Sequence, residues 1–300
     1  MRILLYGGSG FLGLNLAHHF SNIGNEVIIV SRSEPLFSSP NVEYIGLDSF
    51  QSEPGNILKE IDVFFYLIGR ASPRQDDFAI ASTCQAEIDD LIFLFSVIRT
   101  FEAGLKFVYL SSGGSVYGDS KGIPFCEADE LNPITAYGRV KRTGEEIVTV
   151  FATNGNVPFL VLRPSNIYGR YQSSQRRQGV ISIFTDLIIR SKAIEIFGNG
   201  NSKKDYIYID DFLAAVHGLL ASKAVGIFNI GSGFEGSVNE IVSILESELK
   251  LQVNKNYIDL ETPDIVSLSL DCKKLSNITR FSASVNLEDG IRLYLRSIYK

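Results

Sequence analysis

The chain has 300 residues, enough for one large domain or two closely associated ones. Its net charge of −6 at pH 7 argues against nucleic acid or an anionic membrane as a partner, because both need a basic patch. The three cysteines and three histidines lack metal-ligand spacing, and no apolar run approaches the roughly 20 residues of a membrane span. We therefore expect a cytoplasmic protein with reduced thiols and no bound metal.

The first 30 residues follow the order strand, glycine-rich turn, helix, strand. Apolar spacing predicts strands over residues 3–6 and 27–30 and a helix over residues 14–23. The turn has glycines at three positions, where they permit a tight bend, a close approach of the backbone to a pyrophosphate, and close packing of the helix on the strand. The pattern predicts a dinucleotide site with these residues: Gly7, Gly10, Phe11, Leu12 and Gly13.

The residues after the second strand bear on the choice of dinucleotide. An acidic side chain there holds the ribose 2′-hydroxyl of NAD, whereas an arginine suits the 2′-phosphate of NADP. The chain reads Ser31-Arg32-Ser33, with no acid before Glu34. Arg32 therefore indicates NADP or tolerance of both dinucleotides, and the alternative is an arginine that lies over the adenine or in solvent. The cofactor prediction is NAD or NADP.

The alternation of strands and helices continues beyond residue 40. We expect strands over residues 42–47, 61–68 and 106–110 and a helix over residues 85–99. Repeated units of this kind predict an α/β fold with a Rossmann-type, doubly wound parallel sheet that binds ligands at the carboxyl ends of its strands. Three further cofactor candidates lie at such ends: Asp48 for the adenine, and Leu67 and Gly69 where a ribose would pass.

Tyr137 and Lys141 are the candidate catalytic pair. On a helix, residues four apart share a face, so the phenol and the ammonium would point the same way. A lone phenol has a pKa of about 10 and is a poor base at neutral pH, but a neighbouring cation lowers that pKa. The pair predicts a proton acceptor for an alcohol that loses hydride. The alternative is a solvent-facing pair, which this spacing often produces.

Several motifs together resemble one family. They are the glycine turn, the serine-rich loop at residues 111–118, the Tyr137/Lys141 pair, and segments at residues 162–169, 205–211 and 228–233. Because these motifs occur in this order along the sequence, the chain resembles an extended short-chain dehydrogenase/reductase of the NAD-dependent nucleotide-sugar epimerase/dehydratase group, similar to UDP-glucose 4-epimerases. The resemblance covers nearly the whole chain.

The resemblance implies catalytic roles. Tyr137 would be the general base, Lys141 would bind the nicotinamide ribose and stabilise the phenolate, and a hydroxyl side chain would hold the sugar hydroxyl. That last position falls on Gly113, so we take Ser112 as the substitute and Ser115 as the second candidate. The alternative is that both serines satisfy backbone groups of the turn. The two positions after Gly113 hold no carboxylate, which disfavours dehydration, because the dehydratases carry an acidic pair there.

The resemblance also implies residues for ligand binding. It places Pro164 at the cofactor, Asn166 at the substrate, and Lys204 where relatives have a diphosphate-binding arginine. A lysine neutralises phosphate without the bidentate fork of arginine, and an ordinary surface lysine is the alternative. A second phosphate-binding arginine is usual where residues 261–263 read Glu-Thr-Pro. Three basic residues are candidates to replace it: Arg176, Arg177 and Lys255.

These predictions give a domain plan and three readings of function. Residues 1–165, with about 206–232, would form a dinucleotide-binding domain, and residues 166–205 and 233–300 a smaller, interleaved C-terminal substrate lobe.

The leading hypothesis of function is an NAD(P)-dependent nucleotide-sugar 4-epimerase acting through a transient 4-keto sugar. The alternatives are an NADPH-dependent nucleotide-4-keto-sugar reductase and a non-catalytic nucleotide-sensing protein. Relatives often pair through two long helices, so a homodimer through residues 85–99 and 137–153 is a further prediction.

Overall fold

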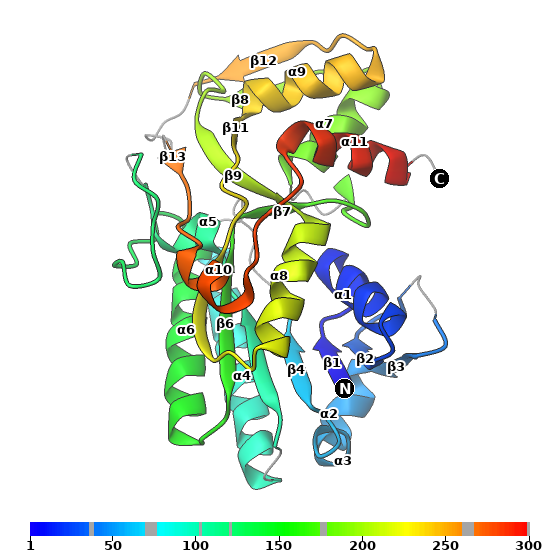
Figure 1. The fold of residues 1–300 in the computed structure, drawn as a ribbon, viewed down its shortest axis with the longest axis vertical. Helices are drawn as coiled ribbons and strands as arrows, with labels where there is room; N and C mark the ends of the chain where they lie inside the picture. Colours follow the sequence, from blue (N-terminus) through cyan, green and yellow to red (C-terminus); the bar gives the residue numbers. More distant parts are fainter. Residues whose placement is uncertain are drawn as a thin grey trace. The chain divides into compact units, whose positions relative to one another are not determined.

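The computed structural model describes residues 1–35, 39–69, 77–101, 104–119, 122–174, 179–259 and 267–298, with side chains omitted for residues 77–81. These residues form two compact units (Figure 1). Unit 1 comprises Met1–Val116, Pro133–Arg163 and Ala224–Phe228. Unit 2 comprises Tyr117–Asn132, Pro164–Lys223 and Asn229–Lys300.

This division differs from the predicted lobes in two longer segments and, at residues 164–165 and 229–232, in two short ones. Residues 206–223 belong to unit 2, because the strand that leads into them pairs only with other strands of that unit in the described part of the chain. Tyr117–Asn132 also belongs there, since the Phe125 carbonyl and the Glu127 carboxylate accept hydrogen bonds from Asn229. The cofactor and substrate roles of the two lobes stay predictions.

A seven-stranded sheet organises unit 1, with the last residues of two of its strands assigned to unit 2. Its order is β10-β6-β5-β4-β1-β2-β3, and every pair from β6 to β3 is parallel. The order 3-2-1-4-5-6 within it is that of a doubly wound sheet, which confirms the predicted Rossmann-type fold. The strands are β1 (Arg2–Tyr6), β2 (Glu26–Ser31), β3 (Val42–Gly46), β4 (Val63–Tyr66), β5 (Lys106–Leu110), β6 (Phe159–Pro164) and β10 (Gly226–Ile230).

Helices cover both faces of this sheet. The helices of unit 1 are α1 (Phe11–Asn22), α2 (Leu47–Ser52), α3 (Pro54–Leu58), α4 (Asp77–Thr100), α5 (Gly113–Val116) and α6 (Ala136–Asn154). Phe20 of α1 packs against Phe65 on one face, and Phe95 of α4 packs against Phe107 on the other. The strand expected over residues 42–47 ends earlier, because Leu47 and Asp48 begin α2.

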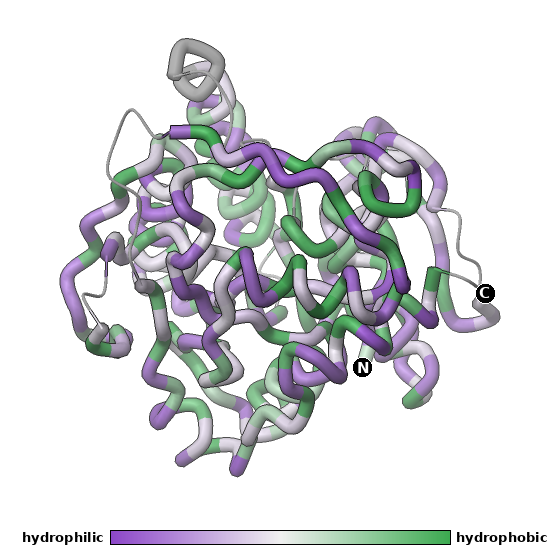
Figure 2. The backbone as a smooth tube through the Cα atoms, turned by 90° about the horizontal axis from the view of Figure 1, so that it is seen from above, coloured by the Kyte–Doolittle hydropathy of each residue, from purple (hydrophilic) through white to green (hydrophobic). Residues whose placement is uncertain are grey.

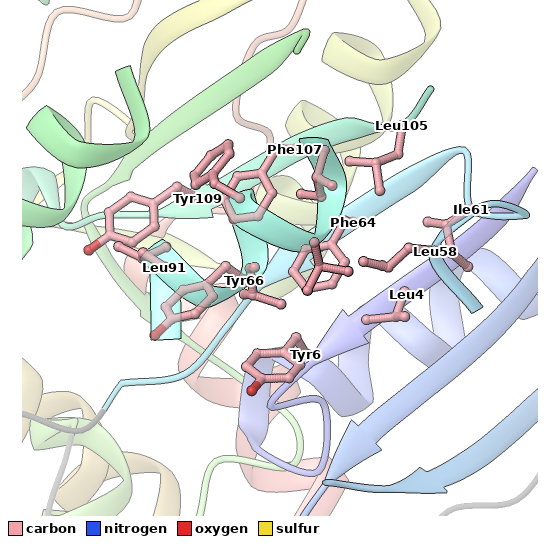
Figure 3. Packing of buried hydrophobic residues seen from close by; sticks show 14 of the residues in the cluster. Leu4, Tyr6, Leu58, Ile61, Phe64, Tyr66, Leu91, Leu105, Phe107 and Tyr109 are labelled. Carbon is pink, nitrogen blue, oxygen red and sulfur yellow. The ribbon is translucent and has the colours of Figure 1, made fainter. Parts of the chain in front are cut away.

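Aromatic side chains form much of the core under α4. Tyr6, Tyr66 and Tyr109 are partners in register across β1, β4 and β5, and neighbouring rings stack with centroids 5.9 and 5.8 Å apart. Figure 3 shows their hydroxyls directed toward one end of the cluster, away from Leu105. All three tyrosines lie near the carboxyl ends of their strands, so this row of phenols leads toward the ligand-binding edge of the sheet.

Unit 2 contains two smaller sheets. One joins β7 (Asn166–Tyr168), β9 (Lys203–Tyr208), β11 (Glu235–Ser237) and β13 (Ser267–Leu268), and the other joins β8 (Ile194–Phe197) and β12 (Lys255–Ile258). Its helices are α7 (Val180–Ile189), α8 (Ile209–Ala221), α9 (Val238–Leu249), α10 (Lys273–Thr279) and α11 (Leu287–Ile298). At the start of α9, Ser237 and Glu240 exchange backbone and side-chain hydrogen bonds in a capping box.

Hydrophilic and hydrophobic residues are interspersed along most of the chain, as Figure 2 shows. Among the described helices, none combines the length and the apolar character that crossing a bilayer would require.

Gly13 provides a test of the close packing between α1 and the glycine turn. A Cβ at this position would overlap the backbone of Gly8, which has no freedom to rotate away. Gly13→Ala is therefore expected to lower the free energy of unfolding by about 2–3 kcal/mol, measured by urea denaturation. Gly46→Ala is the control, because Gly46 has a φ of −61° and, among the described residues, its Cβ would meet only the Ser49 hydroxyl, at 3.8 Å. Equal stability of the two variants would contradict the packing described.

Candidate active site

The glycine turn between β1 and α1 has the conformation that a dinucleotide site needs. Gly7 has a φ of +87°, its amide donates to the Val30 carbonyl at 2.8 Å, and a Cβ there would lie 2.8 Å from Ile68 Cγ1. Gly10 is the N-cap of α1, and the first turn has neither a side-chain cap nor an acidic residue. The N-terminal amides of α1 are thus left for an anion, and the turn fits a pyrophosphate. Those amides belong to Phe11, Leu12 and Gly13.

Leu67 and Gly69 follow β4, which lies beside β1 at the point where the strand order reverses. The Leu67 amide donates to the Tyr6 carbonyl at 2.8 Å, so the end of β4 runs along the glycine turn. Gly69 is exposed, and a Cβ there would meet no atom within 4 Å. Packing against the described residues therefore does not require glycine at this position, which is consistent with space kept for a ligand.

Arg32 and Asp48 lie at the ends of neighbouring strands. Ser31 pairs with Gly46, so β2 and β3 bring the two residues to the same edge of the sheet. Both side chains are exposed, and neither forms an ion pair with another described residue. Their predicted contacts with the cofactor stay predictions.

The start of α6 lies directly against α5. Thr135 caps α6 by accepting a hydrogen bond from the Gly138 amide at 3.1 Å, and a Cβ on Gly138 would overlap the Ser115 carbonyl. This contact puts half-buried Tyr137 in the turn that packs on the serine loop. The Ser112 hydroxyl donates to the Ser115 hydroxyl at 3.2 Å. The two candidate serines thus form one hydrogen-bonded pair beside the helix turn that carries Tyr137.

Lys141 is buried one turn after Tyr137, with a relative exposure of 4%. Its Nζ donates to Glu87 Oε1 at 3.0 Å and lies 5.0 Å from the centre of the Tyr109 ring. The Tyr109 hydroxyl donates to the same carboxylate oxygen at 2.6 Å. The sequence analysis missed Glu87, because this acid meets Lys141 only through the packing of α4 on α6.

The charge of Lys141 depends on its partners. Burial lowers the pKa of Lys141, but the Glu87 carboxylate, and to a lesser degree Tyr137, outweigh burial and raise the pKa above its ordinary value. Burial and Glu87 also raise the pKa of Tyr109 well above its usual range, which keeps this phenol a hydrogen-bond donor. Because the folded pKa of Lys141 exceeds the unfolded one, the ion pair contributes stability below about pH 10 and loses it as the pH rises through the folded pKa.

A second buried ion pair holds the same helix one turn further on. Arg163 Nη2 donates to Glu145 Oε2 at 2.6 Å, and Arg163 Nε lies 3.0 and 3.1 Å from the two carboxylate oxygens. The Ser111 hydroxyl also donates to Glu145. Glu145 thus ties α6 to the ends of β5 and β6 and fixes the helix that carries the candidate base.

Asn166 and Lys204 lie on neighbouring parallel strands of unit 2. The Asn166 side-chain amide donates to the Asp205 carbonyl at 2.9 Å, so its nitrogen already has a structural partner. Lys204 is half-buried and forms no ion pair with another described residue. Pro164 is the last residue of β6. The contacts of these three residues with ligands stay predictions.

Asp205 was not among the predicted site residues, and its role in the structure is internal. Its buried carboxylate accepts hydrogen bonds from the Ser165 hydroxyl at 2.9 Å and from the Ser232 and Gly233 amides at 3.0 and 3.1 Å. Burial raises the pKa of Asp205, and the hydrogen bonds from these residues oppose that rise. Asp205 therefore joins three segments of unit 2 rather than presenting a free acid.

The candidates for a second phosphate-binding cation fall partly outside the described residues. Arg176, Arg177 and residues 261–263 lie there. Lys255 is described, and its ammonium donates to Glu246 Oε2 at 2.7 Å.

Comparison with known proteins agrees with this geometry. The model of the NAD dependent epimerase/dehydratase family matches residues 3–231. The chain belongs to this family. The resemblance predicted from the motifs is thereby confirmed.

Individual relatives differ in the reaction that their names state. A putative UDP-glucose 4-epimerase of Methanocaldococcus jannaschii is 27% identical over 97% of this chain and 96% of its own. A dTDP-4-dehydro-6-deoxyglucose reductase of Escherichia coli is 30% identical over 99% of this chain and 97% of its own. The crystal structure of a Bacillus cereus UDP-glucuronic acid 4-epimerase with UDP-glucuronic acid and NAD has a TM-score of 0.88 and 25% identity, covering 100% and 99% of the two chains.

Adjacent glutamates on α6 test the energetic role of the buried ion pair. Glu145→Gln removes the buried carboxylate that binds Arg163 and is expected to lower the free energy of unfolding by about 3 kcal/mol or more. Glu146→Gln is the matched control, because the Arg142–Glu146 pair is exposed and should contribute less than about 0.5 kcal/mol. Urea denaturation measures both, and equal losses would contradict the assignment.

Proposed function

We propose that this member of the family is an NAD-dependent nucleotide-sugar 4-epimerase that acts through a transient 4-keto sugar. The observation that supports it best is the arrangement on α6, where Tyr137 precedes the buried Lys141 ammonium by one turn and the Ser112–Ser115 hydroxyl pair packs against the same turn. The nicotinamide of a bound dinucleotide supplies the hydride acceptor and donor that such a reaction requires.

Each residue of this group has a role in moving one proton. Tyr137 removes the proton of the C4 hydroxyl while the C4–H bond breaks, and later returns that proton to the same oxygen, so the net proton balance is zero. Lys141 stabilises the phenolate through its positive charge. Ser112 turns its one hydroxyl hydrogen from Ser115 to the sugar oxygen and holds that oxygen beside the phenol, while Ser115 can donate to Ser112 in return. The absence of a carboxylate after Gly113 supports epimerisation over dehydration.

Residues of unit 2 are proposed to bind the nucleotide part of the substrate. Lys204 has no ion-pair partner among the described residues, which supports a role in neutralising a phosphate. Asn166 retains a side-chain oxygen as an acceptor for a substrate hydroxyl or amide. We also propose a homodimer through α4 and α6, supported by the exposed apolar side chains of Ile92, Val150 and Phe151.

A 4-keto-sugar reductase is the second candidate. The exposed Arg32 favours NADP, and the Escherichia coli relative is named a reductase. The NAD in the Bacillus cereus epimerase structure favours the first candidate. A nucleotide-sensing protein without activity is the third reading, and the Tyr137/Lys141 pair argues against it.

The dinucleotide that the purified protein carries distinguishes these candidates. We expect denaturation to release NAD, identified by chromatography and mass spectrometry, because an epimerase keeps its cofactor through both half-reactions. Consumption of added NADPH with a nucleotide-4-keto sugar would indicate the reductase instead. Bound nucleotide without turnover of any nucleotide sugar would indicate the sensor.

Replacement of the phenol tests the proposed base. Tyr137→Phe is expected to lower kcat for interconversion of a UDP-hexose by roughly 10²–10⁴-fold, because the ring is kept and only the proton-accepting oxygen is removed. Dinucleotide should stay bound. Tyr257→Phe is the control, since this tyrosine lies on β12 and is 55% exposed. Undiminished turnover in Tyr137→Phe would exclude the phenol as the base.

A further inference from the structure

Glu87 is a buried carboxylate whose position cannot be explained by stability alone. Its residue is 1% exposed, and taking a carboxylate and an ammonium out of water has a large desolvation cost that well-packed apolar side chains avoid. Glu87 Oε2 is buried without a hydrogen-bond partner among the described residues, which adds to that cost. The other oxygen meets Lys141 Nζ at 3.0 Å, so the carboxylate lies behind the candidate catalytic pair.

We propose that Glu87 is a positioning residue of this active site, which holds the Lys141 ammonium in one place and keeps it charged beside Tyr137. This inference rests on the proposed function in one respect, namely that Tyr137 acts as the base. Lysine has three N–H donors. One of them is committed to Glu87, which fixes the direction of the other two and leaves them for the cofactor ribose.

The groups that face Lys141 show why Glu87 is needed. They are Glu87 from α4, Tyr109 from β5, and Tyr137 and Glu145 from α6. Cys84 interacts with Glu87, and Tyr66 interacts with Tyr109. Burial and Glu87 raise the pKa of the Cys84 thiol and of the Tyr109 phenol, so both stay neutral. Glu145 is neutralised by Arg163. Among the described residues, Glu87 is thus the carboxylate in direct contact that compensates the charge of Lys141.

Without Glu87, burial would act on Lys141 with little opposition. Buried lysines that lack a counter-ion lose their proton several pH units earlier than exposed ones. A neutral amine stabilises phenolate poorly and forms weaker hydrogen bonds to a ribose than an ammonium does. A charge-removing substitution of Glu87 should therefore introduce a pH dependence that the native protein lacks.

NADH binding against pH tests the proposal without requiring turnover. Any NAD that the purified protein carries is first removed, and NADH binding is then followed by the fluorescence of its nicotinamide. We expect the NADH affinity of the native protein to stay constant between about pH 6.5 and about pH 9.5. In Glu87→Gln it should fall about tenfold over this range, as Lys141 loses its proton. Glu87→Gln/Lys141→Arg should again be independent of pH, because a guanidinium stays charged without help.

Two control variants separate charge from hydrogen bonding. Tyr109→Phe removes the neutral donor to the same carboxylate oxygen and should leave the pH profile flat. Asp89→Asn removes a charge from the exposed side of α4 and should also leave it flat. A Glu87→Gln profile that runs parallel to the native one would overturn the proposal.

The outcomes distinguish this inference from the proposed function. A native protein that carries no dinucleotide and binds no NADH would contradict the proposed function itself. Native binding with an unchanged Glu87→Gln profile would overturn only the role of Glu87. If Glu87→Gln does not fold, Glu87→Gln/Lys141→Met removes both charges together. Recovery of the fold in this double variant supports the coupling, whereas a double variant that stays unfolded would show that Glu87 acts independently of Lys141 and would overturn the proposal.

Discussion

The buried ion pair between Lys141 and Glu87 is the interaction on which the candidate active site depends. It joins α4 to α6 across the carboxyl end of β5, where Tyr109 supplies a ring below the ammonium and a hydroxyl to the carboxylate. An ammonium in this position carries its charge without exposure to water, and charge in such surroundings acts strongly on neighbouring groups. A phenol one helical turn away is therefore under the influence of a fixed cation.

Close backbone contacts give this electrostatic arrangement its geometry. Gly138 lets the first turn of α6 approach the Ser115 carbonyl, and Glu145 binds Arg163 and Ser111 at the ends of two strands. The helix is thus fixed at three successive turns, at Gly138, Lys141 and Glu145. A functional group on such a helix is held more precisely than one on a loop, which is the condition for proton transfer over a short distance.

The parts of the molecule that the sequence predicted are those specified locally. The glycine turn, the alternation of strands and helices, and the Tyr137/Lys141 spacing each follow from short patterns. The role of Glu87 could not be predicted in this way, because its partner lies 54 residues away and nothing in the local pattern of α4 marks the contact. The hydrogen bond between Ser112 and Ser115 was also unforeseen, since Gly113 begins a single helical turn that brings the two hydroxyls together. Long-range packing decides such contacts.

The protonation state of Lys141 in the native protein tests the central claim most directly. In protein labelled with ¹⁵N-lysine, ammonium and neutral amine nitrogens give distinct NMR signals, and Lys141→Arg identifies the signal of this residue. The structure predicts a Lys141 ammonium that persists to about pH 9.5 or beyond, because Glu87 outweighs the effect of burial. A Lys141 nitrogen that becomes neutral below about pH 8 would contradict the claim that a fixed cation lies beside the phenol.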